Sequence, residues 1–162
     1  MSKKDKADKK SKGKKKEVAQ EAAHELGAAI VQAARSMRTR LSRNLAESGL
    51  YAGQDGVIQA LSSEDGLTPG ALAQKLGVKA PTMTRTISRL EAQGFVERRA
   101  DDKDARLTKV HLTEVGMASL SQIDEASREC GEQAVKGLSG KEVKLLVRLL
   151  ETVEANLQER SG

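Results

Sequence analysis

Arginines and small hydroxyl side chains share one side of a segment with helical periodicity. On a helix from Ala80 to Gln93, the apolar residues Met83, Ile87 and Leu90 fall within about 60° of arc. The polar residues on the remaining circumference are Thr82, Thr84, Arg85, Ser88 and Arg89. Arginine can pair with guanine through two hydrogen bonds, and hydroxyls can reach bases or phosphates without steric bulk. The pattern is suited to reading a DNA groove, although a helix of this kind standing alone would be an ordinary surface helix.

A second charged set lies in a predicted β-hairpin. Residues 95–99 and 106–112 have strand character, and the charged segment 100–105 separates them. In an extended chain, Asp104 and Arg106 point to the same side, so the carboxylate could orient the guanidinium for insertion into a narrow minor groove. The alternative is a surface ion pair of little energetic value.

The elements before these residues complete a helix-turn-helix. Residues 54–61 predict one short helix, and Thr68 followed by Pro69 predicts the N-cap and first turn of another. With the helix and hairpin above, residues 67–116 have the order of a winged helix-turn-helix. In that motif the second helix enters the major groove and the hairpin contacts the backbone or the adjacent minor groove.

Three longer helices are predicted outside this unit. Residues from Val18 to about Glu47 carry apolar side chains at three- and four-residue steps, and residues from Glu114 to about Lys136 predict one further helix. The last helix opens with the capping box of Ser139 and Glu142 and carries a wide stripe of leucines and valines. An apolar face of that width needs a partner.

Positive charge is unevenly distributed along the 162 residues, whose net charge is +5. Residues 1–16 contain nine lysines and two aspartates, a charge of +7. Residues 17–67 carry −3, residues 68–111 carry +4 and residues 112–162 carry −3. The basic part of the predicted folded body is therefore the part with the winged-helix pattern, and the acidic flanks are not expected to lie on phosphate.

The lysine-rich start has almost no apolar side chain, so residues 1–16 are predicted to be a disordered tail. This tail either solubilises the protein or adds sequence-independent affinity for DNA. A lysine tract attracts any polyanion, so the sequence favours neither reading.

Other classes of site find little support. Cys130 is the only cysteine, which excludes an intramolecular disulfide and any multi-cysteine metal site. His24 and Glu25 begin like a zinc motif, but position 28 is alanine, and His111 is expected to face a neighbour in the fold. We find no glycine-rich phosphate loop, nucleophile–base pair, signal peptide or membrane-spanning run. The expectation is a cytoplasmic protein that is not an enzyme and holds no metal or cofactor.

The residues 104–116, DARLTKVHLTEVG, resemble the wing signature of the MarR family of bacterial transcriptional regulators, D-x-R-x(5)-L-T-x-x-G, at every fixed position. The segments LAQKLGV and PTMTRTISRLEAQGFVERR are similar to the helix-turn-helix core of that family. The resemblance covers most of the chain, from about Val18 to Gln158.

The resemblance implies a mainly α fold with a small β-hairpin wing, dimerising through its N- and C-terminal helices. Each copy would read one half of a palindromic operator in double-stranded DNA, as a repressor that a small anionic or aromatic ligand releases. Carried over by position, Pro81, Thr82, Thr84 and Arg85 would meet the major groove. Arg106 would meet the minor groove, with Asp104 positioning it.

Two departures from the family pattern affect this expectation. Lys79 stands where the family commonly has a serine cap, so a phosphate contact could replace that cap. Family ligand pockets are often lined by aromatic rings, whereas Tyr51 and Phe95 are the only aromatic residues here. The residues that would line a ligand pocket here are Arg35, Met37, Arg38, Tyr51 and Met117.

The sequence thus predicts a tail (1–16), an N-terminal dimerisation helix (17–50), a DNA-binding region (51–116) and C-terminal dimerisation helices (117–162). The predicted function is a sequence-specific, homodimeric DNA-binding regulator. The alternatives are a protein-binding winged-helix adaptor and an architectural DNA-binding protein without ligand control.

Overall fold

The computed structural model of the protein describes the backbone of residues 3–102, 104 and 106–158, with side chains from residue 22 onward. The helices are α1 (Lys3–Leu45), the 3-10 turn η1 (Ala46–Ser48), α2 (Gln54–Ser63), α3 (Pro69–Lys75), α4 (Ala80–Ala92), α5 (Glu114–Ala118), α6 (Leu120–Ala134) and α7 (Gly140–Gln158). The strands β1 (Val96–Ala100) and β2 (Thr108–Leu112) form one antiparallel hairpin. The predicted fold class is confirmed: the chain is mainly helical with a small β-hairpin.

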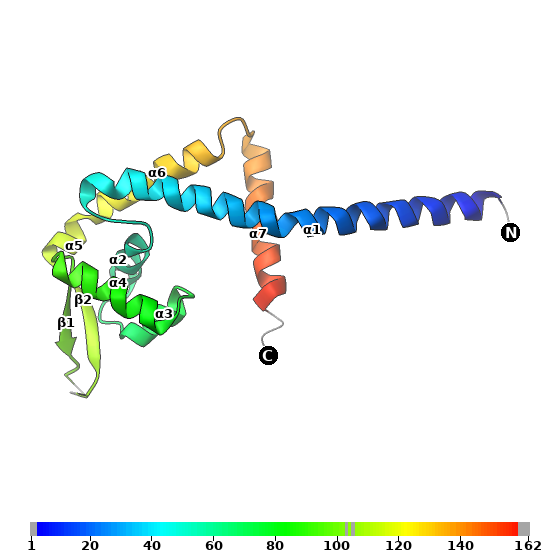
Figure 1. Ribbon diagram of the computed structural model, residues 1–162. Coiled ribbons are helices and arrows are strands. Elements are labelled where there is room, and N and C mark those ends of the chain that lie inside the picture. Colours follow the sequence, from blue (N-terminus) through cyan, green and yellow to red (C-terminus); the bar gives the residue numbers. More distant parts are fainter. Residues whose placement is uncertain (1–2, 103, 105, 159–162) are drawn as a thin grey trace.

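Helices α2, α3 and α4 and the hairpin form a lobe beside the C-terminal end of α1 (Figure 1). Helix α6 runs back along α1 in the opposite direction and packs against it, whereas the N-terminal half of α1 extends away from the lobe (Figure 1). The chain therefore combines a compact lobe with a long helical extension.

Buried aliphatic side chains from every part of the lobe and from α6 form one core. Ile58 from α2, Leu72 from α3, Ile87 from α4, Val110 from β2 and Ile123 from α6 all have an exposed fraction of 0%. Burial of each such side chain contributes about 2 kcal/mol. The core fixes α4 and the hairpin relative to each other.

The hairpin is paired in register from Val96 opposite Leu112 to Ala100 opposite Thr108. The carbonyl of Leu67 accepts a hydrogen bond of 2.9 Å from the N–H of Val110, so the segment before α3 extends the ladder on the other side of β2.

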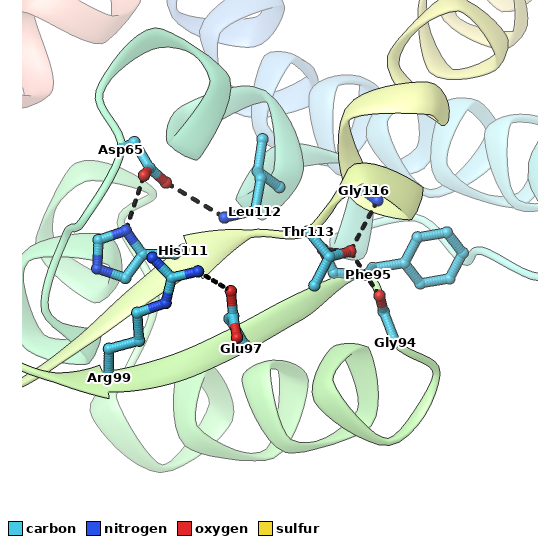
Figure 2. A network of polar contacts seen from close by, with 9 residues as sticks. All are labelled: Asp65, Gly94, Phe95, Glu97, Arg99, His111, Leu112, Thr113 and Gly116. Atoms are coloured by element: carbon cyan, nitrogen blue, oxygen red, sulfur yellow. Dashed lines mark hydrogen bonds and ion pairs between the residues drawn. The ribbon is translucent and has the colours of Figure 1, made fainter.

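Thr113 joins the hairpin to α5 and Gly116 lies in the first turn of that helix; their contacts explain two fixed positions of the sequence signature (Figure 2). The Thr113 hydroxyl donates to the carbonyl of Gly94 at 2.6 Å and accepts from the N–H of Gly116 at 3.1 Å, which confirms Thr113 as the N-cap. A Cβ atom at Gly116 would lie 2.2 Å from the carbonyl oxygen of Phe95. Only glycine permits this approach of α5 to the chain before β1.

The structure corrects the single helix predicted from Glu114 to about Lys136. Helix α5 ends at Ala118 and α6 begins at Leu120, with Ser119 between them. The hydroxyl of Ser119, which is 5% exposed, donates to the carbonyl of Gly116 at 2.7 Å. A side chain that occupies a helical carbonyl in this way competes with the backbone ladder and favours a break.

The predicted disorder of residues 1–16 also differs from the structure, in which α1 begins at Lys3. Lysine is a good helix former, and adding a residue to an existing helix avoids the cost of nucleation. The lack of apolar side chains in residues 1–16 therefore does not prevent a helix there, because the helix that follows supplies the nucleus.

Helix α7 opens as predicted. The hydroxyl and the N–H of Ser139 both lie 2.7 Å from Oε2 of Glu142, and these hydrogen bonds hold the pKa of the Glu142 carboxyl below its ordinary value. The rest of the helix has no buried residue within the chain. Its leucine and valine stripe is therefore uncovered in a single copy.

Candidate nucleic-acid interface

Helix α4 is anchored by its apolar side and presents its polar side outward. Met83 is 2% exposed, and Ile87 and Leu90 are 0% exposed, so the predicted stripe is confirmed. The predicted reading residues are all exposed: Lys79, Pro81, Thr82, Thr84, Arg85, Ser88 and Arg89. The packing of the lobe therefore turns these side chains toward solvent.

The start of α4 lacks a side-chain cap, as expected from the lysine at position 79. Lys79 occupies the N-cap position with extended backbone angles and no side-chain hydrogen bond to the helix, and Pro81 lies in the first turn. The Lys79 ammonium group is thus available for an anion, and the positive end of the helix dipole adds to the local potential.

The hydroxyl groups of α4 have different local roles. Thr84 donates its hydroxyl hydrogen to the carbonyl of Ala80 at 3.0 Å, which leaves the exposed hydroxyl oxygen able to accept a further hydrogen bond. The Ser88 hydroxyl instead accepts a hydrogen bond of 3.0 Å from the guanidinium of Arg98. Ser88 therefore connects α4 to β1 in addition to lying on the exposed side.

Sequence reasoning missed Arg98, whose guanidinium also pairs with Glu91. The neighbouring Arg99 is exposed and pairs with Glu97 on the same strand (Figure 2). Alternation along a strand implies that one of two successive arginines faces the preceding helix, so the pattern carried a usable signal.

Arg85, Arg89 and Arg106 form no ion pair with the residues that the structure describes. All three are exposed, on α4 and near the hairpin tip. Cations without an internal carboxylate partner can give their full charge to phosphates or base edges. The lobe thus carries available positive charge at the places where a winged helix contacts DNA.

The expected contact between the Asp104 carboxylate and the Arg106 guanidinium is corrected. Oδ1 of Asp104 accepts a hydrogen bond of 3.0 Å from the backbone N–H of Arg106, and the Asp104 carbonyl accepts one of 2.9 Å from the N–H of Leu107. The chain turns here and is not extended, so the two side chains are not constrained to one side. Asp104 still positions Arg106, through its backbone.

The base of the hairpin is tied to the loop before α3 by Asp65 (Figure 2). Its carboxylate contacts Nδ1 of His111 at 2.7 Å and accepts from the N–H of Leu112 at 3.2 Å. Burial raises the pKa of Asp65, but the hydrogen bonds from His111 and Leu112 outweigh it and lower that pKa below its ordinary value. The prediction that His111 faces a neighbour in the fold agrees with this contact.

The predicted ligand residues are only partly brought together. Arg38 and Tyr51 line a pocket of about 400 Å³ that continues to Thr82, Met83 and Arg89 of α4. Met37 and Arg38 line a neighbouring pocket of about 260 Å³ with Cys130.

The other two predicted ligand residues lie elsewhere. Arg35 borders a separate polar hollow of about 300 Å³ on α1. Met117 is 55% exposed on α5 and lines none of these three pockets. The sequence could not separate these positions, because the directions of α1 and α5 relative to the lobe are set by tertiary packing.

Comparisons with known proteins agree with this geometry. A MarR family model matches residues 54–107. The HTH-type transcriptional repressor IacR of Pseudomonas putida is 35% identical over 80 residues, which are 49% of this chain and 48% of IacR. The match therefore spans about half the length of that curated relative.

Solved structures match over more of the chain. A mutant of MarR from E. coli, complexed with operator DNA, is 29% identical with a TM-score of 0.74, covering 79% of this chain and 92% of that one. A MarR transcriptional regulator from Methanosarcina mazei is 26% identical with a TM-score of 0.76, covering 83% and 96%. Together with the anchored α4 and its hairpin, these matches show that residues 54–107 are a winged helix-turn-helix region of the MarR family, in a chain whose fold is similar to that of MarR transcriptional regulators.

Proposed function

We propose that the protein is a homodimeric transcriptional repressor that reads a palindromic operator with α4 and the hairpin of each copy. The observation that carries this is the set of exposed arginines Arg85, Arg89 and Arg106, which have no ion pair among the described residues. Arg85 and Arg89 lie on a helix whose opposite side is buried, and Arg106 lies near the hairpin tip. A cationic, rigidly held helix of this kind is the part that a winged helix places in the major groove.

The uncovered stripe of α7 supports a homodimer. Leu146 and Leu150 are each 43% exposed, Leu149 is 52% exposed and Leu157 is 70% exposed. An exposed apolar stripe of this extent favours burial against a second copy, and a two-fold axis would place the same stripe on both sides. The two copies of α4 would then lie roughly 34 Å apart, one turn of DNA.

The pocket between Arg38, Tyr51 and Arg89 supports release by a small anionic ligand. Its volume of about 400 Å³ suits a compact organic acid, and two guanidinium groups border it. Because Arg89 belongs to both the pocket and α4, a bound anion would compete with DNA for that side chain.

The decisive experiment is selection of bound duplexes from a random pool. Recovery of an inverted repeat with half-sites about one helical turn apart would support the proposal. Recovery of no preferred sequence would favour the architectural alternative. If a protein lacking residues 1–16 shows a DNA affinity that does not change with salt, the protein-binding adaptor would be favoured.

We place this function in the cytoplasm, where the operator is accessible. Within the part of the chain that the structure describes, no helix has both the length and the apolar character needed to cross a bilayer.

A further inference from the structure

A chain of amide hydrogen bonds connects the end of α4 to the junction between α1 and α2. Nε2 of Gln93 donates to the carbonyl of Gly49 at 2.7 Å, and Oε1 of Gln93 accepts from Nε2 of Gln54 at 2.9 Å. Oε1 of Gln54 in turn accepts from the N–H of Tyr51 at 2.9 Å. Two side-chain amides thus bridge segments that are about forty residues apart in the sequence.

The orientation of both amides is fixed by the backbone groups at the two ends. A carbonyl at Gly49 requires a donor, and an N–H at Tyr51 requires an acceptor. Rotating either side-chain amide by half a turn would place two donors or two acceptors against each other. The chain therefore has one arrangement in which every contact is satisfied.

The bridge links parts of the molecule with different tasks. Gln93 is the C-cap of α4, and Gly49 is the C-cap of η1, where the chain leaves α1 with a φ of 70°. Gln54 is the first residue of α2 and is 6% exposed, whereas the side of α4 that bears Gln93 is open to solvent. A nearly buried polar side chain at this point is costly unless its hydrogen bonds are made.

The core fixes the place of α4 in the lobe, and the hydrogen bonds of Gln93 add a directional constraint at the end of the helix. Met83, Ile87 and Leu90 form a stripe along one side of α4. Burial of such a stripe opposes separation of α4 from the lobe more than it opposes rotation of α4 about the stripe. Hydrogen bonds add direction, because they weaken steeply when the donor angle changes. The hydrogen bonds of Gln93 hold the C-terminal end of α4 to the segment that follows α1.

We propose that Gln93 and Gln54 are positioning residues, which hold the recognition helix α4 at a fixed angle to α1. In a dimer built through the helical extension, this angle sets the separation of the two copies of α4. The inference rests on the proposed function, because the separation matters only for a palindromic operator. If each copy bound DNA on its own, the affinity would not depend on the angle between α4 and α1.

The test replaces Gln93 by methionine, which keeps the length of the side chain but makes no comparable hydrogen bond. Q93M should bind the selected inverted repeat about five- to tenfold more weakly than wild type, with unchanged affinity for a random duplex. Gln54→Met should have a similar effect, and the double variant should lose little more than either single one, because both residues serve one bridge. Gln133→Met, an exposed change on α6, is the matched control and should equal wild type.

A measurement without DNA separates this inference from the proposed function. Spin labels on cysteines that replace Thr39 on α1 and Thr84 on α4, in protein diluted with unlabelled copies and carrying Cys130→Ser, report the distance between these points on the two helices. The distance distribution should broaden in Q93M and not in the Gln133→Met control. An unchanged distribution, or equal losses on operator and random DNA, would overturn the role of the bridge. Failure to select any inverted repeat would overturn only the proposed function, since the distance measurement would still decide the inference.

Discussion

Helices α4 and α7 have the same kind of sequence pattern and opposite fates in a single copy of the chain. The apolar stripe of α4 is buried, with Ile87 and Leu90 at 0% exposure. The stripe of α7 is open, with Leu146 and Leu150 at 43%. Amphipathic periodicity therefore shows that a helix needs a partner but not which chain supplies it.

This difference separates intramolecular from intermolecular stability. Changes on the buried side of α4 should weaken folding of the lobe, whereas changes on α7 should weaken association and leave the lobe intact. The expected effects below run from the largest to the smallest.

The largest effect is expected on association. Changing Leu146 and Leu150 of α7 together to glutamate places two carboxylates one helical turn apart on the proposed dimer face. Because burying unpaired charges is very costly, the dimer dissociation constant should rise by roughly a thousandfold or more. Sedimentation should show monomers, while circular dichroism retains the helical content. A dimer of undiminished affinity would mean that α7 is not the interface.

The counterpart in α4 should affect folding. Ile87→Ala removes a fully buried side chain and should lower the free energy of unfolding by about 3 kcal/mol. Urea denaturation in the Leu146→Glu, Leu150→Glu background, where association does not contribute, measures this change, and the exposed substitution Leu149→Ala on α7 is the control, which should alter it little. Comparable losses for the two would erase the distinction between the helices.

Gly116 tests how closely the hairpin and α5 approach. A methyl group there meets the Phe95 carbonyl, so Gly116→Ala should destabilise the lobe by about 2 kcal/mol. At Gly131 in α6 a Cβ meets nothing within 4 Å, so Gly131→Ala should instead stabilise the protein by about 0.5 kcal/mol. Thermal unfolding of the pair should therefore shift in opposite directions, and a shift of the same sign would contradict the packing.

Loss of a DNA contact should leave folding unchanged. Arg85→Ala on the exposed side of α4 should weaken binding to the selected operator by about 1 to 3 kcal/mol, and binding to random DNA much less. Removing residues 1–16 is the comparison, since lysines that contact phosphate should weaken binding to both duplexes alike. Equal losses on the two duplexes for Arg85→Ala would exclude base reading by this residue.

The smallest effect concerns the base of the hairpin. The pKa of Asp65 is lowered in the folded protein, so its carboxylate contributes stability that is present above the ordinary value of 3.8 and is lost as the pH falls through the lowered pKa. Asp65→Asn should cost less than about 1 kcal/mol at pH 7, because more than half of the side chain is exposed. The urea midpoints of the two proteins should converge in acid. A difference that stays constant with pH would show that Asp65 does not contribute to the pH dependence of stability.

Local chemistry made several features predictable. The N-caps Thr68 and Thr113, the Ser139 box and the buried stripe of α4 follow from neighbouring residues, because capping and helical periodicity act within a few positions. The turn at Arg106 was missed because an extended strand was assumed up to the hairpin tip. The break at Ser119 was missed because apolar residues continue on both sides of it, although its hydroxyl contact with the Gly116 carbonyl joins residues only three positions apart.

The sequence by itself determined the winged-helix order, the wing signature and the helix that carries the exposed arginines. Only the tertiary structure decided that Ser88 binds Arg98, that Arg35 and Met117 lie apart from the pocket beside Tyr51, and that Gln54 and Gln93 meet. The physical reason is that these contacts join separate elements. Their geometry depends on how the common core fixes those elements in space, and no local pattern records it.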